Sequence, residues 1–148
     1  MEALHYLLMK THTNLKRWIV NEAAELKLLP GQPKVLECLM SCGESNQKAI
    51  AQYCEIEQAT VGSILQRMER DGLIRRTQKD GNRRSLYVSL TPRGEEMGRK
   101  MEEIFHRADA MASAGLSQEE RAQLERLLER VQEAIASEKR GRRDESNG

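Results

Sequence analysis

The sequence predicts a mainly α-helical chain that carries one small β-hairpin. Three features predict it: an apolar helical stripe between Glu57 and Asp71, a basic two-strand pattern directly after it, and long apolar repeats near both ends. A helix that runs into a basic hairpin indicates a winged helix-turn-helix core. The fold class is therefore α+β, with long N- and C-terminal dimerisation helices flanking that core.

The first helix is predicted from Met1 to about Leu28, where the sequence Pro30-Gly31-Gln32-Pro33 interrupts it. A second helix, from about Gln32 to Ser41, presents apolar residues at helical spacing. The apolar residues of these two helices are Leu4, Leu8, Leu15, Trp18 and Leu26, then Val35, Leu36, Leu39 and Met40.

A short capped helix is predicted to begin near Ser45, and Tyr53 to Ile56 form the turn into the next helix. The two helices together make a helix-turn-helix. Because the first helix of such a unit points its amides at the DNA backbone, we expect Ser45, Gln47 and Lys48 to bind phosphate.

The helix between Glu57 and Asp71 has one apolar and one polar face. Val61, Ile64, Leu65 and Met68 form the apolar stripe. The polar face lacks bulky hydrophobic residues, which suits a helix that lies in a DNA major groove. Arg70 lies on the same polar face, and Gly62 beside it would let the backbone approach the DNA closely. Thr60 is expected to bind phosphate. We assign base contacts to Gln58, Ala59, Ser63, Gln66 and Arg67.

Gly72 is predicted to end this helix in the left-handed conformation. Two strands follow, from Arg75 to Lys79 and from Ser85 to Leu90, with turn residues at Asp80-Gly81-Asn82 between them. Arg83 and Arg84 stand at the tip of this hairpin, and we expect them to lie along or inside the adjacent minor groove. Thr91 is the predicted N-cap of the next helix, with Pro92 at its first position.

Two helices complete the chain, one from Pro92 to Gly115 and one that begins at a capping box of Ser117 and Glu120. Their stripes are Met97, Met101, Ile104, Ala108 and Met111, then Leu124, Leu127, Leu128, Val131 and Ile135. A small core cannot bury all these stripes, so we expect the first and last helices to pack against a second copy of the chain. An intramolecular bundle is the alternative.

We predict one domain over residues 1–138, with a core at about 32–92 and dimerisation helices at about 1–28 and 92–138. Residues 139–148 form a basic, polar tail that we expect to be disordered, with contact to the DNA backbone as the alternative.

Charge is unevenly divided along a chain whose net charge is only +1. Residues 56–94 hold eight Lys or Arg and four acidic residues, a balance of +4, whereas residues 95–138 hold six and eleven, a balance of −5. The positive charge therefore lies where phosphate neutralisation would need it.

No apolar run is long enough to span a membrane and no signal segment precedes the first helix, so we expect a cytoplasmic, nucleoid-associated protein with reduced thiols.

The run Ile56-Glu57-Gln58-Ala59-Thr60-Val61, the segment Gly72-Leu73-Ile74, and Asn82-Arg83-Arg84 followed by Val88-Ser89-Leu90-Thr91-Pro92-Arg93-Gly94 resemble the MarR family of bacterial transcription regulators. The likeness extends over nearly the whole chain. In that family an aspartate usually stands two residues before a key wing arginine; here Asn82 holds that place and Arg84 is the matching arginine. Asp80 lies close enough in sequence to replace that aspartate in its contact with the wing arginine.

The resemblance implies a homodimer that binds a near-palindromic, double-stranded operator, usually as a repressor, and that is released by a small molecule or by oxidation. It also implies a crevice between the dimerisation helices and the DNA-binding lobe. By position, we expect its lining to include His12, Leu15, Trp18, Cys38 and Cys42. Cys38 and Cys42 share a helical face and suit a redox pair or two metal ligands, but buried cysteines that act as small hydrophobes are the preferred interpretation.

The sequence argues against an enzyme, because no cluster of histidine, cysteine or carboxylate shows catalytic spacing. Ser45 and Lys48 match one motif of penicillin-recognising enzymes, but the accompanying motifs do not occur. We predict no cofactor, no metal site and no membrane partner. A winged helix that serves only for protein docking, or as an architectural nucleic-acid-binding module without ligand sensing, is the alternative function.

Overall fold

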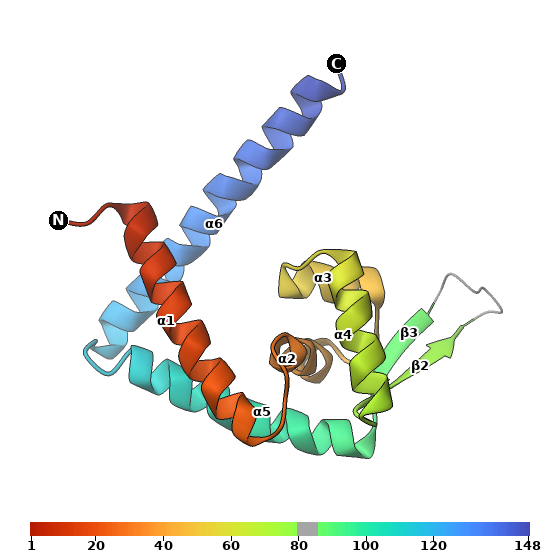
Figure 1. Ribbon diagram of the computed structural model, residues 1–148. Helices are drawn as coiled ribbons and strands as arrows, with labels where there is room; N and C mark the ends of the chain where they lie inside the picture. The colour runs from red at the N-terminus through yellow and green to blue at the C-terminus, as the bar shows by residue number, and fades with distance from the viewer. Residues whose placement is uncertain (80–85) are drawn as a thin grey trace. The chain divides into compact units, whose positions relative to one another are not determined.

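The computed structural model describes residues 1–79 and 86–148, so the predicted wing residues Arg83 and Arg84 lie outside the described part. The described chain is mainly helical with a small antiparallel sheet, as the sequence predicts (Figure 1). Its elements in order are α1 (Leu4–Glu25), α2 (Gln32–Cys42), β1 (Ser45–Asn46), α3 (Gln47–Cys54), α4 (Gln58–Arg70), β2 (Ile74–Gln78), β3 (Leu86–Leu90), α5 (Pro92–Ala112) and α6 (Gln118–Ser146).

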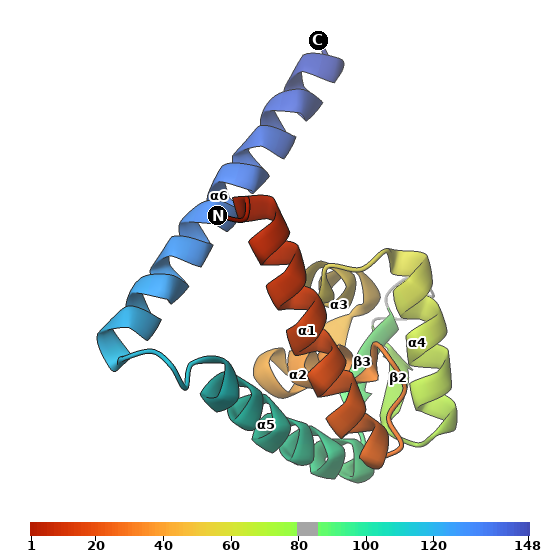
Figure 2. The same cartoon turned by 60° about the vertical axis from the view of Figure 1, so that its left-hand side comes forward.

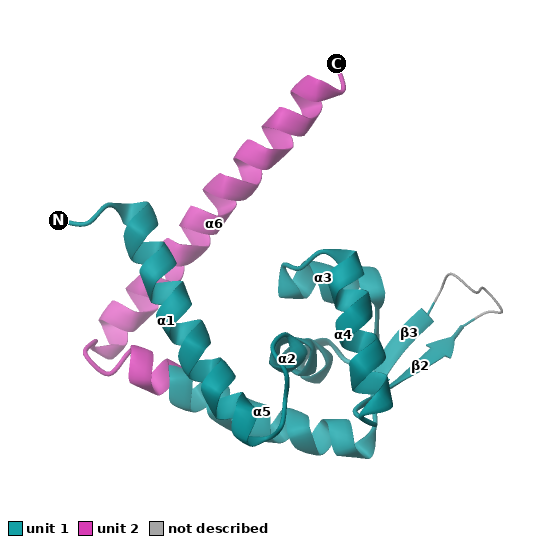
Figure 3. Cartoon of the chain, in the orientation of Figure 1, with its two compact units in different colours: residues 1–108 teal, residues 109–148 magenta. Residues whose placement is uncertain are grey.

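The chain divides into two compact units, residues 1–108 and 109–148 (Figure 3). The first holds the helix-turn-helix, the sheet, α1 and most of α5. The second holds the end of α5 and all of α6. Among the described residues, no helix combines the length and the apolar character that crossing a membrane would require.

The hydrophobic core of the first unit surrounds α2, with α1, α3, α4 and α5 placed around that helix (Figures 1 and 2). Fully buried side chains come from every one of these elements and from the sheet. They include Ala23, Val35, Leu36, Ile50, Val61, Leu65, Met68, Val88 and Met101. The core is aliphatic, in agreement with a chain that has only five aromatic residues.

The sheet has the strand order β1-β3-β2, and both pairs are antiparallel. Ile74 pairs with Leu90 and Arg76 with Val88, which places the buried Ile74 and Val88 on the core side. The short strand β1 was not predicted, because two residues are too few to show an alternating pattern. Ser45 pairs there with Val88, and the sheet thus joins the helix-turn-helix to the hairpin.

Three helix starts follow from local signals. Thr91 caps α5: its Oγ1 accepts from the Gly94 amide at 3.0 Å and donates to the Gly72 carbonyl at 2.6 Å. The predicted capping box at the start of α6 is confirmed, with both reciprocal hydrogen bonds between Ser117 and Glu120 present. The predicted capped start of α3 is also confirmed: the cap is Asn46, whose side chain accepts from the Ala49 amide at 2.8 Å.

The structure also corrects the C-terminus. We expected residues 139–148 to be disordered, yet α6 continues to Ser146. Once a helix has formed, adding residues is much easier than starting a new one, and an ion pair of 3.0 Å between Glu138 and Arg142 supports this turn. Apolar periodicity, whose absence led us to expect disorder, is not required for such an extension.

Candidate nucleic-acid interface

The polar face of α4 is held outward because the opposite face is buried. Val61, Leu65 and Met68 have no exposed surface, and Ile64 is half-buried. This fixes the rotation of α4 about its axis, so the polar residues point away from the core. The exposed ones are Gln58, Ala59, Thr60, Ser63, Gln66, Arg67 and Arg70. The structure therefore brings these predicted contact residues together on one surface of one helix.

Contacts within this surface leave some side chains freer than others. The Ser63 hydroxyl donates to the Ala59 carbonyl at 3.4 Å, and Arg67 forms an ion pair of 3.3 Å with Asp71. Arg70 forms no ion pair within the residues described, nor does the exposed Lys48 at the start of α3. Two unpaired cations at this surface suit binding to phosphate.

Gly62 has a packing role that the sequence did not reveal. A β-carbon there would come within 3.1 Å of Nε2 of Gln47, so a side chain at this position would press on the Gln47 amide. The same Nε2 donates to the Gln58 carbonyl at 3.0 Å. Gln47 thus braces the helix-turn-helix, and its amide is occupied by this internal contact.

Ser45 is oriented differently from the prediction. It lies in β1, its side chain is largely buried, and its hydroxyl donates to the Gly43 carbonyl at 2.9 Å. A hydroxyl held in this way does not face a DNA backbone. The phosphate-facing candidates at this helix start are therefore Lys48 and the free amides of α3, rather than Ser45.

Two further cations anchor the base of the hairpin. Arg76 in β2 forms hydrogen bonds with both carboxylate oxygens of Glu69 in α4, at 3.2 and 3.3 Å. Lys79 lies 3.1 Å from a carboxylate oxygen of Glu44 and 4.9 Å from the ring centre of Tyr87. Sequence reasoning missed both contacts, because nothing in the spacing of these residues marks them as neighbours.

The five candidate ligand residues do not form one site in the structure. His12 and Cys42 are exposed, Leu15 and Trp18 are half-buried on α1, and Cys38 is buried in the core. The Arg107 guanidinium lies 5.7 Å from the Trp18 ring centre. A pocket of about 710 Å³ lies elsewhere in the first unit and contains none of the five.

The thiols have the character of core residues. Burial raises the pKa of Cys38 to about 12, and the neighbouring Cys54 and Cys42 add to the increase. Burial also raises the pKa of Cys54. A thiol needs a lowered pKa to react readily, so these two cysteines are poorly suited to sense oxidants. Within the described residues, no group of three or more His, Cys, Asp or Glu is arranged to hold a metal ion.

Comparison with known proteins gives relatives over most of the chain. Residues 28–86 match the MarR family. The HTH-type transcriptional regulator MgrA of Staphylococcus aureus is 30% identical over 132 residues, which are 88% of each chain. The regulator YkoM of Bacillus subtilis, itself uncharacterised, is 27% identical over 128 residues, 86% of this chain and 83% of its own.

Solved structures share the fold. A MarR family regulator from Listeria monocytogenes, in complex with a 26mer DNA, aligns with a TM-score of 0.86 and 22% identity over 93% of this chain and 92% of its own. BpsR of Bordetella bronchiseptica, whose DNA binding is regulated by 6-hydroxynicotinic acid, aligns with a TM-score of 0.81 and 24% identity over 88% and 99%.

Proposed function

Because the chain belongs to the MarR family of transcriptional regulators, we propose that it represses transcription as a homodimer bound to a near-palindromic operator, and that a small molecule releases it. One observation carries the DNA-binding part of this proposal. The outer face of α4 is exposed, polar and free of bulky hydrophobic residues, and the buried stripe behind it fixes its orientation.

In the proposed complex α4 lies in the major groove. Gln58, Ser63 and Gln66 reach base edges, Thr60 and Lys48 reach phosphates, and Arg67 and Arg70 contact bases or backbone towards the end of the helix. Arg83 and Arg84 contact the minor groove, a role that stays a prediction from the sequence. Two such helices would occupy successive major grooves about 34 to 36 Å apart.

The proposed homodimer is supported by apolar surface on the terminal helices. In the described part of the chain, α6 has no fully buried residue, and Leu124, Leu127, Leu128 and Ile135 are each 40 to 51% exposed along one face. On α1, Leu4, Leu7 and Met9 are likewise exposed. Apolar residues that recur at helical spacing without cover are typical of helices that pack against a second chain.

Release by a small molecule requires that the ligand bind the DNA-free state more tightly than the DNA-bound state. BpsR, which shares the fold, is regulated by 6-hydroxynicotinic acid, and this supports an effector for the present chain.

Operator selection from a random duplex library, followed by mobility shifts with the DNA upstream of the chain's own coding region, tests the DNA-binding part. We expect an inverted repeat and tight, salt-dependent binding. If no sequence is enriched and no mobility shift occurs even at low ionic strength, the DNA-binding proposal is refuted and the protein-docking function is favoured. Light scattering tests the dimer: Leu127→Glu with Leu128→Glu should give monomers, whereas Arg126→Glu on the opposite face of α6 should not.

A further inference from the structure

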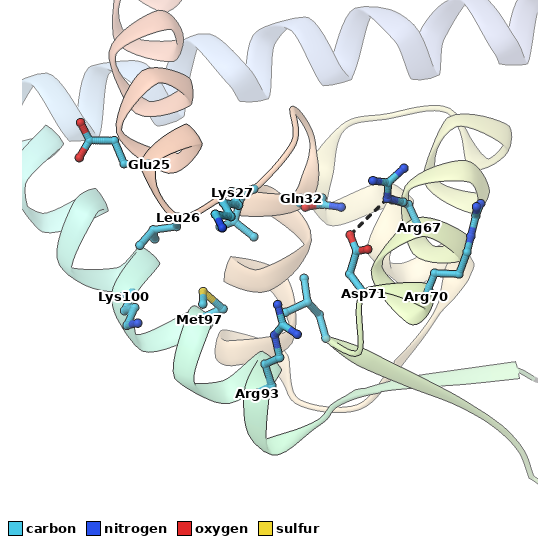
Figure 4. A pocket seen from close by; sticks show the side chains of 12 residues that line it. Glu25, Leu26, Lys27, Gln32, Arg67, Arg70, Asp71, Arg93, Met97 and Lys100 are labelled. Carbon is cyan, nitrogen blue, oxygen red and sulfur yellow. Dashed lines mark hydrogen bonds and ion pairs between the residues drawn. The ribbon is translucent and has the colours of Figure 1, made fainter.

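The pocket of about 710 Å³ is strongly cationic. It lies where the end of α1, the start of α2, the end of α4 and the start of α5 meet (Figure 4). Five basic side chains line it, against the two acidic residues Glu25 and Asp71, and the carbon surfaces of Leu26, Leu73 and Met97 contribute its apolar part. The basic residues are Lys27, Arg67, Arg70, Arg93 and Lys100.

Most of this positive charge is not neutralised by the protein. Arg67 pairs with Asp71 at 3.3 Å, and Lys100 pairs at 3.6 Å with Glu96, which is outside the pocket lining. The other three cations form no ion pair with any residue in the described ranges 1–79 and 86–148. The lining therefore has an excess of positive charge, which would stabilise an anion bound in the hollow.

A buried amide at the wall of the pocket lacks an acceptor. Gln32 is only 2% exposed, and its Oε1 accepts a hydrogen bond of 3.0 Å from the Leu29 amide. That bond fixes which end of the side chain is nitrogen. Nε2 is buried without a hydrogen-bond partner among the described residues, and Figure 4 shows it directed towards Arg67 and Asp71. Buried donors are nearly always paired, so this one indicates an acceptor supplied from outside the chain.

We propose that this pocket binds a small organic dianion, a phosphate ester or a dicarboxylate, and that its binding competes with operator DNA. Three unpaired cations match a doubly charged group, the Gln32 amide donates to one of its oxygens, and Leu26, Leu73 and Met97 contact its carbon part. Arg67 and Arg70 line the pocket and also lie on the proposed DNA-reading face. A ligand that holds these two side chains removes them from the DNA.

Calorimetry on the full chain without DNA tests the site itself. Inorganic phosphate, succinate and acetate are titrated at one fixed ionic strength. We expect saturable binding of phosphate or succinate at least about tenfold tighter than that of acetate, because acetate carries one charge; the tighter of the two dianions identifies the ligand class. Arg93→Gln and Lys27→Gln should each weaken binding about tenfold, whereas Arg99→Gln, on α5 but outside the pocket lining, should not. Absence of saturable dianion binding, or equal affinities in the pocket and control variants, would overturn the proposal.

Fluorescence anisotropy with the selected operator tests the competition, which rests on the proposed function. At matched ionic strength, a saturating dianion should raise the operator Kd at least about tenfold in the wild type and clearly less in Arg93→Gln. A dianion that binds without changing the operator Kd would overturn the competition. If the protein binds dianions as expected but binds no DNA, the proposed function is refuted while the anion site is supported.

Discussion

Arg76 and Glu69 join the hairpin to α4, the helix that we propose reads DNA. The Nε of Arg76 donates to one carboxylate oxygen of Glu69 at 3.3 Å and the Nη2 donates to the other at 3.2 Å. Arg76 lies in β2 and Glu69 in the last turn of α4, so this two-point contact ties the base of the hairpin to the end of α4. The Arg76 side chain is 23% exposed and that of Glu69 is 44% exposed, so water only partly screens the pair.

The first prediction concerns this pair. We expect Arg76→Gln and Glu69→Gln each to lower the free energy of unfolding by about 1 kcal/mol or less, as is usual for partly exposed pairs. Operator affinity should fall severalfold in each variant, because the base of the hairpin is no longer tied to the end of α4. Urea unfolding and anisotropy on both single variants and the double variant measure the coupling. Arg121→Gln, which breaks a 3.0 Å pair on α6, is the control. Additive effects in the double variant would refute a direct role for the contact.

The helices and most of their ends could be predicted because their signals are local. Thr91 before a proline, and Ser117 three residues before Glu120, specify caps within a single turn of chain. The apolar stripe of α4 likewise predicted which of its faces is buried, and with it the exposed face that we propose contacts DNA.

Contacts between distant residues could not be predicted in this way. Gln47 donates to the Gln58 carbonyl, and Lys79 pairs with Glu44, only because the fold brings their elements together. The same holds for the inward position of Ser45, which depends on its pairing with β3. The cationic pocket is a further example, since its lining comes from four helix ends and the short connections beside them.

A second prediction concerns the start of α5. A β-carbon at Gly94 would overlap the backbone carbonyl oxygen of Leu73, which cannot move without shifting the hairpin. We expect Gly94→Ala to lower the free energy of unfolding by about 2 to 3 kcal/mol. Gly141→Ala, in α6 with open space around it, should instead be neutral or stabilise the helix by up to about 1 kcal/mol. Chemical denaturation of both variants decides this, and equal stabilities would contradict it.

A third prediction separates base reading from backbone binding. Gln66→Ala removes a side chain that we place at a base edge, so it should change which operator variants bind best, with a cost of about 1 to 3 kcal/mol at one base pair. Arg84→Ala should weaken all duplexes alike and reduce the slope of log affinity against log salt by about one. Salt titrations against a panel of single-base operator variants measure both effects. A uniform loss for the Gln66 variant would argue against base contact.

A fourth prediction follows from the thiols. Cys42 is exposed, whereas Cys38 and Cys54 are buried with raised pKa values. Iodoacetamide at pH 8 should therefore label Cys42 in the native protein, and Cys38 and Cys54 only after denaturation, as peptide mass mapping can follow. If Cys38 in the native protein is labelled as fast as Cys42, its thiolate is accessible, and Cys38 is again a candidate redox sensor.

The raised pKa of Cys38 also gives stability a pH dependence. In the unfolded chain this thiol loses its proton near its ordinary pKa of 9.0, but in the folded chain only near 12. Between these values the unfolded state binds fewer protons, so the free energy of unfolding should fall as pH rises above about 9. The contribution is fully present below that pH. Denaturation from pH 7 to 10.5 should show a steeper decline for the wild type than for Cys38→Ala, because alanine has no proton to lose. Cys42→Ala keeps the burial of Cys38, which is the largest cause of its raised pKa, so this variant should decline nearly as steeply as the wild type. Parallel curves for all three proteins would mean that Cys38 is not desolvated by the fold.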